Sequence, residues 1–175
     1  MQLKKSNVAM SLLATLALLF GGWFLYLKLQ MEGPIRAQLE QMESASLNHM
    51  QIEKDKILIN VRVTNPKRFP KEYRELVKET AKLAGDREVL VTIGNASEDM
   101  QAIWNEGQFV FTEAVDLHQY SRIPELMADW KSNYQLDEAF ALMDDENVYV
   151  YLKKGTEDFY TIVSRSLENE VTADA

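Results

Sequence analysis

The sequence predicts an α+β fold, with one N-terminal transmembrane helix followed by a layered domain of helices and mostly antiparallel sheet. Two observations support this. A long uncharged apolar run opens the chain, and the rest alternates between segments with helical and with strand-like apolar spacing. The predicted order after the first helix is α-β-β-α-β-α-α-β-β-β.

The apolar run predicts a membrane anchor. Lys4 and Lys5 precede it and Lys28 follows it, and as a helix Val8 to Leu27 spans about 30 Å, the thickness of a hydrocarbon core. No small-x-small cleavage pattern follows the run, which favours an uncleaved anchor over a signal peptide. The lysines ahead of the run predict a single-pass protein of the cell membrane. Its N-terminus would be cytoplasmic and its domain extracytoplasmic.

The lipid bilayer is the first predicted partner. Two residues of the run suggest contacts with lipid headgroups, and two others suggest contacts with a second helix. Trp23 and Tyr26 lie at its distal end, where aromatic rings prefer the headgroup zone. Ala17 and Gly21 form a small-xxx-small pair that would let two such helices pack closely. The alternative for this pair is a plain lipid-facing anchor.

The domain organisation follows from these segments. Pro34 suits the first turn of an amphipathic juxtamembrane helix, which packs on its own domain or pairs with another copy. The predicted parts are a short cytoplasmic segment 1–7, the anchor 8–28, the juxtamembrane helix 29–46, the α+β domain 47–166 and a disordered acidic tail 167–175.

The first half of the domain is predicted to be a hairpin, a helix and a strand. Residues 47–64 alternate apolar and polar side chains, as two half-buried strands do. Residues 70–84 form the clearest amphipathic helix, with Gly85 placed to end it. Residues 88–93 are apolar on both faces, which predicts a strand in the interior of the sheet.

The second half begins with a long helix. Ser97 is a suitable cap, and apolar residues keep helical phase from there to His118. The alternative is a break at Gly107 followed by a strand over 109–111. A shorter helix over 124–130 comes next.

The end of the domain predicts a three-stranded antiparallel meander. Its strands are residues 139–143, 148–152 and 159–163, and polar turns separate them.

The α-β-β-α-β order of residues 34–94 resembles, as an order of elements, the small ring-building modules of envelope secretion and sporulation complexes. This resemblance implies a subunit that assembles with copies of itself into a ring or scaffold.

Composition excludes several functions. The whole chain carries a net charge of −8, which argues against nucleic-acid binding. It has no cysteine, so disulfides and thiolate chemistry are absent. His49 and His118 have no neighbouring acidic residue or second histidine at metal-ligand spacing. We therefore predict no enzyme activity, no cofactor and no metal, and bacterial rather than animal origin.

One surface feature suggests a partner. The helix over 70–84 and the residues before it carry basic side chains at spacings of three and four, beside an acidic stripe. Such a ridge would dock an acidic partner, although exposed helices often carry an ordinary solvated face of this kind. The basic ridge is Lys67, Arg68, Lys71, Arg74, Lys78 and Lys82.

Three functions follow from these observations. The first is a non-enzymatic adaptor or assembly factor that binds other proteins of the cell envelope. The second is a self-assembling scaffold, a homo-oligomer. The third is a ligand sensor or hydrolase with a pocket between the long helix and the meander, near Trp104, Phe111, Tyr149 and Tyr151.

Overall fold

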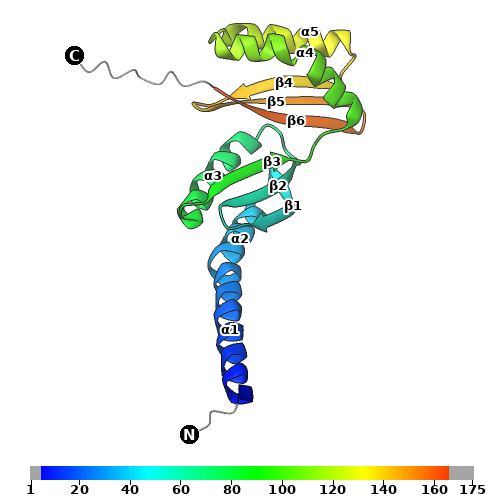
Figure 1. Cartoon of the computed structure of the whole chain (residues 1–175). Helices are drawn as coiled ribbons and strands as arrows, with labels where there is room; N and C mark the ends of the chain where they lie inside the picture. The colour runs from blue at the N-terminus through cyan, green and yellow to red at the C-terminus, as the bar shows by residue number, and fades with distance from the viewer. Residues whose placement is uncertain (1–4, 166–175) are drawn as a thin grey trace, which may run out of the picture.

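The computed structural model describes residues 5–165, and the side chains of 5–9, 24, 27 and 28 are outside the description. It consists of a projecting N-terminal helix and two small α/β layers stacked above it (Figure 1). The elements are α1 (Lys5–Leu27), η1 (Lys28–Glu32), α2 (Gly33–Gln41), β1 (Ala45–Ile52), β2 (Lys56–Val63), α3 (Phe69–Ala84), β3 (Glu88–Ile93), α4 (Glu98–Asp116), η2 (Tyr120–Arg122), α5 (Ile123–Asn133), β4 (Glu138–Met143), β5 (Asn147–Lys154) and β6 (Glu157–Ser164).

The N-terminal helix requires a correction. Within the described residues, no helix reaches the combination of length and apolarity that crossing a membrane requires. This finding contradicts the predicted transmembrane anchor over 8–28. It also contradicts the predictions that depend on the anchor, which are the single-pass topology and the extracytoplasmic location of the domain.

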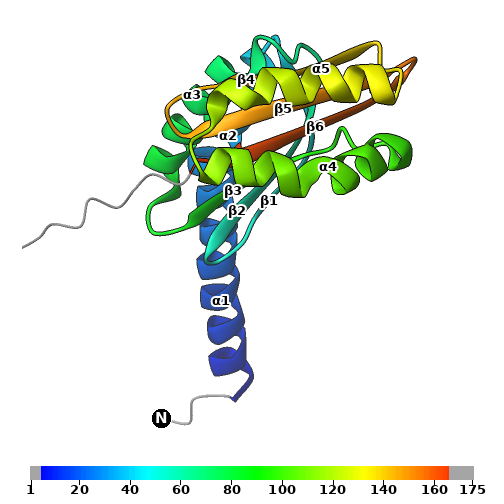
Figure 2. The ribbon, with the colours of Figure 1, turned by 90° about the horizontal axis from the view of Figure 1, so that it is seen from above.

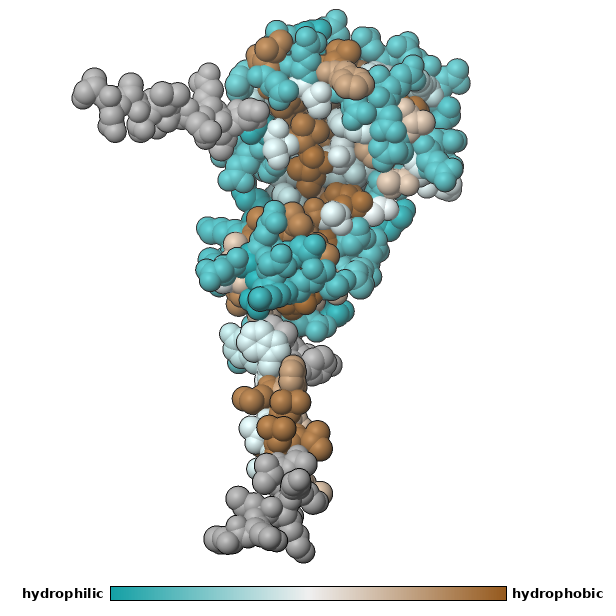
Figure 3. All heavy atoms as spheres, in the orientation of Figure 1, coloured by the Kyte–Doolittle hydropathy of each residue, from teal (hydrophilic) through white to brown (hydrophobic). Residues whose placement is uncertain are grey.

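α1 nevertheless carries an exposed apolar surface (Figure 3). Leu18 is 77% exposed, and the rings of Trp23 and Tyr26 stack with centroids 6.0 Å apart. Ala17 and Gly21 are both exposed, so their predicted packing against a second helix stays a prediction. Lys4 and the tail 167–175 lie outside the described residues, as do the side chains of Lys5 and Lys28.

The first layer is a three-stranded sheet of order β1-β2-β3, covered on one face by α2 and α3. β1 and β2 form the predicted hairpin, whereas β2 and β3 are parallel because α3 crosses over between them. Ile57, Ile59 and Val61 of the central strand are fully buried beneath the helices.

Two predictions for this layer are wrong in detail. β3 is an edge strand rather than an interior one, and its Leu90 is exposed on the open face of the sheet. The juxtamembrane helix ends at Gln41 rather than at 46, because Met42 is extended and β1 begins at Ala45. The prediction that this helix packs on its own domain is confirmed by the burial of Ile35.

The second layer is an antiparallel meander of order β4-β5-β6, which is separate from the first sheet. Figure 2 shows α4 and α5 lying over one face of it. Val150 and Leu152 face these helices, whereas Tyr149 and Tyr151 face the first layer. Both faces of this sheet are therefore covered.

α4 continues through Gly107 without a break, so the preferred helix is confirmed and the alternative strand over 109–111 is wrong. Its predicted cap is also confirmed, because the Ser97 side chain accepts a hydrogen bond from the amide of Met100.

Buried Thr80 of α3 offers a test of the first layer. Its side chain is fully buried, and its hydroxyl has no hydrogen-bond partner in the described part of the chain. Thr80→Val replaces the hydroxyl by a methyl group of similar size and helix propensity. We expect it to raise the free energy of unfolding by about 1 kcal/mol in urea denaturation. Thr112→Val on α4, where the hydroxyl is bonded to backbone carbonyls, serves as the control and should not stabilise.

Candidate functional site: the groove between α2 and β1

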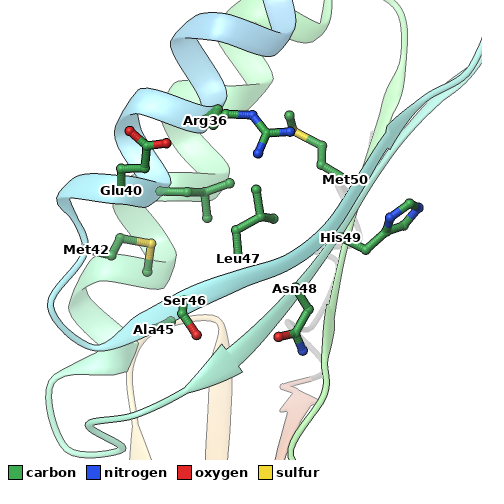
Figure 4. A pocket seen from close by; sticks show the side chains of 10 residues that line it. Arg36, Glu40, Met42, Ala45, Ser46, Leu47, Asn48, His49 and Met50 are labelled. Carbon is green, nitrogen blue, oxygen red and sulfur yellow. The ribbon is translucent and has the colours of Figure 1, made fainter.

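An open groove lies between α2 and the outer edge of β1 (Figure 4). Its volume is about 450 Å³. This size lies within the range of about 300–1,000 Å³ that is usual for ligand pockets. The residues that line it are Arg36, Leu39, Glu40, Met42, Ala45, Ser46, Leu47, Asn48, His49 and Met50.

The groove has an apolar floor and a charged rim. Leu47 and Met50 are half-buried, and they point from β1 toward α2, where buried Leu39 completes the floor. Arg36 and Glu40 project from α2 one turn apart and are exposed. This arrangement suits a partner that buries apolar side chains in the floor and keeps polar atoms at the rim.

The strand wall of the groove is a free sheet edge. β1 pairs with β2 on one side, and among residues 5–165 no strand lies beside its other edge. A register shift between Leu47 and His49 marks a bulge, in which Asn48 is the extra residue. A bulge twists the edge of a sheet and limits open-ended stacking of further strands on it.

Side chains on the open face of the sheet hold the bulge in place. Asn48 donates to Asn60 at 3.0 Å, and Asn60 donates to Thr92 at 2.9 Å, which links all three strands. Gly94 lies against this row, since a Cβ there would come within 2.5 Å of the Asn48 amide nitrogen.

The corner between α2 and β1 is fixed by Glu72 of α3. Its carboxylate accepts hydrogen bonds from the Ser44 hydroxyl at 2.7 Å and from the amides of Glu43 and Ser44, and it pairs with Arg68 at 2.7 Å. Partial burial alone would raise the pKa of Glu72, but the hydrogen bonds from Ser44 and Glu43 and the charge of Arg68 together lower it.

This lowered pKa predicts a loss of stability in acid. The unfolded pKa of a glutamate is about 4.3, so the contribution of Glu72 is fully present above that pH. It is lost as the pH falls through the lower pKa of the folded state. We expect Glu72→Gln to destabilise the chain at pH 7 and to flatten the decrease of thermal unfolding temperature below pH 4 or so.

Exposed Glu79 on the same helix provides a matched control for stability at pH 7, since it pairs with exposed Lys82 and such solvent-screened pairs contribute little, so Glu79→Gln should destabilise the chain much less than Glu72→Gln. An unchanged acid profile in Glu72→Gln would contradict the role given to this carboxylate.

The predicted basic ridge follows α3 and the residues just before it. Arg68, Arg74 and Lys82 each lie within 4.0 Å of a carboxylate, and Lys67 lies over the ring of Phe140. Lys71 and Lys78 are exposed and project from the same face as Arg74. The ridge is thus partly neutralised within the chain, and its docking role stays a prediction.

The two histidines lie on different segments of the fold. His49 is exposed in the β1 bulge beside the groove, and His118 follows α4 with a φ of 54° and packs edge-on against Tyr120. Among the described residues, no group of three or more histidines, aspartates or glutamates is placed to hold a metal ion.

The four residues predicted to line a pocket between the long helix and the meander do not share one cavity wall in the described structure. Phe111, Tyr149 and Tyr151 are buried in the two cores. Trp104 instead lines a different cleft, between the edges of β3 and β6.

Sequence reasoning missed the α2–β1 groove. One signal was present, because the apolar alternation of β1 slips by one residue between Leu47 and Met50. Such a slip marks a bulge, and bulges favour strands at the edge of a sheet.

Comparison of the chain with protein-family models, with curated proteins and with solved structures found no match.

Proposed function

We propose that this chain is a protein-binding module whose α2–β1 groove takes up an extended segment of a partner protein as an added strand. The observation that carries this proposal is the free edge of β1 beside a helix, with a half-buried apolar floor between them. Strand addition is a common mode of peptide recognition, in which backbone pairing supplies affinity and side-chain pockets supply specificity.

The groove defines the chemistry of the segment. Side chains of a strand alternate between two faces, so every second residue of the partner would enter the floor formed by Leu39, Leu47 and Met50. These side chains would be apolar. The residues between them would face solvent on the open side of the sheet.

Random peptides displayed on phage and selected against the full chain test this proposal. We expect enriched sequences with apolar residues at alternate positions. In NMR spectra of the full chain, the corresponding synthetic peptides should shift the amide signals of residues 45–50.

Two tryptophan variants of α2 give a matched comparison. Glu40→Trp fills the rim of the groove and should abolish binding, whereas Ala37→Trp on the exposed side of the same helix should not. Peptides that bind Glu40→Trp as well as the unaltered chain, or a selection that enriches none, would overturn the proposal.

The self-assembling scaffold is the second candidate. Its support is the predicted α-β-β-α-β order, which recurs in α2-β1-β2-α3-β3 with one face of the sheet open. Sedimentation of the full chain as a defined oligomer would favour it, provided that Lys71→Glu with Lys78→Glu dissociates the oligomer. A monomer at all concentrations would exclude it.

A further inference from the structure

A second cleft lies where the two sheets diverge, between the outer edges of β3 and β6. Its volume is about 420 Å³. Both sheets and two helices contribute to its walls: Thr92 from β3, Thr161 and Ser164 from β6, Tyr73 from α3, and Gln101 and Trp104 from α4.

The walls of this cleft are uncharged. None of the residues that line it is acidic or basic, although 26% of the residues of the chain are charged. The cleft offers hydroxyl, amide and aromatic groups instead. A charged side chain that entered it would lose hydration without gaining an ionic partner, so the cleft selects an uncharged ligand.

The outer edge of β6 is already paired at one end, with residues 95–97 of the segment between β3 and α4. Ala96 forms an antiparallel bridge with Phe159, and the amide of Tyr160 donates to the carbonyl of Asn95 at 2.9 Å. Because backbone groups of a strand point to alternate edges, Ile162 and Ser164 direct theirs outward in the same way as Tyr160. Beyond the bridge, no strand among the described residues occupies this edge.

We propose that this cleft binds an extended, uncharged segment of a partner protein, which continues the antiparallel pairing along β6. The segment would meet the outward backbone groups of Ile162 and Ser164. Its alternate side chains would lie over Trp104 on the α4 side and over Tyr73 on the α3 side, because Phe159 and Tyr160 face these two sides in turn. This site is distinct from the α2–β1 groove and does not depend on it.

Three capped hexapeptides test the proposal, in which valine alternates with threonine, with glutamate or with lysine. In titrations of the full chain followed by NMR, the valine–threonine peptide should shift the amide signals of Ile162 and Ser164 and the indole signal of Trp104. The affinity of the two charged peptides should be lower by a factor of about ten at least. No shift at millimolar peptide, equal binding of all three, or shifts confined to residues 45–50 would overturn it.

A charge substitution sharpens the result. Ser164 is exposed at the mouth of the cleft, so Ser164→Lys adds a cation there without disturbing the core. We expect this variant to bind the valine–glutamate peptide about tenfold more tightly than the unaltered chain does. Thr156→Lys, in the turn at the opposite end of β6, is the matched control. An equal gain in both variants would show that the peptide does not lie beside Ser164, and would overturn the proposal.

Discussion

Replacement of Asn95 by alanine is expected to lower the free energy of unfolding by about 3 kcal/mol, the largest effect that we predict for a single substitution. Asn95 is fully buried where the two sheets meet. Its amide accepts a hydrogen bond from the Val63 amide at 2.6 Å and donates to the Val63 carbonyl at 2.9 Å and to the Asp158 carboxylate at 2.6 Å. Alanine leaves both backbone groups of Val63 buried without a partner.

Urea denaturation followed by tryptophan fluorescence measures this effect. Asn48→Ala is the matched control, because Asn48 is exposed and its hydrogen bond to Asn60 is open to water. We expect a loss below about 1 kcal/mol for the control. Equal losses in the two variants would show that the buried bonds of Asn95 contribute no more than an exposed one.

A nearly isosteric change separates packing from hydrogen bonding at the same position. Asn95→Asp keeps the acceptor for the Val63 amide but places a second carboxylate beside Asp158. We expect it to destabilise the chain strongly at pH 7 and to recover stability as the pH is lowered toward 4 or so, since protonation removes the repulsion.

Gly107→Ala is expected to destabilise the chain by about 2 kcal/mol, although alanine is the better helix former. A Cβ at position 107 would lie 2.1 Å from the Cζ2 atom of Trp130. The indole cannot move away freely, because it packs against Trp104 and Phe111 with ring centroids 6.1 Å away in each case. The overpacking therefore outweighs the gain in helix propensity.

Two further variants check this explanation. Asn105→Ala, at an exposed position of the same helix, should change the stability by less than about 0.5 kcal/mol. Trp130→Phe removes the atoms that alanine would contact, so Gly107→Ala should be less harmful in that background. Additive losses in the double variant would contradict a direct contact between the two positions.

The elements of this chain could largely be predicted from its sequence, because each has a local pattern. β3 was predicted at its observed bounds, and the long helix was correctly extended through Gly107. The position of β3 in the sheet was wrong, since apolar residues such as Val91 are half-buried by packing against the first core, and not by two neighbouring strands. Strand order depends on contacts between distant segments, which a local pattern does not contain.

The candidate site was beyond prediction for the same reason. The groove exists because α2 lies beside β1 at an angle set by Glu72, a residue of a third element. The second cleft exists because the segment after β3 meets β6, which is far away in sequence, at Ala96 and Phe159, while the edges of β3 and β6 diverge from there. By contrast, the basic ridge along α3 could be predicted from the sequence, because helical spacing alone places its side chains on one face.

The helical path from α1 through η1 into α2 has a mechanical consequence. The π-helical segment η1 (Lys28–Glu32) joins α1 to α2 without an intervening loop (Figure 1). Buried Met31 of η1 and Ile35 of α2 fix this end of the helical path to the first core. A displacement of α1 relative to the first layer would therefore be transmitted to α2, which forms one wall of the α2–β1 groove.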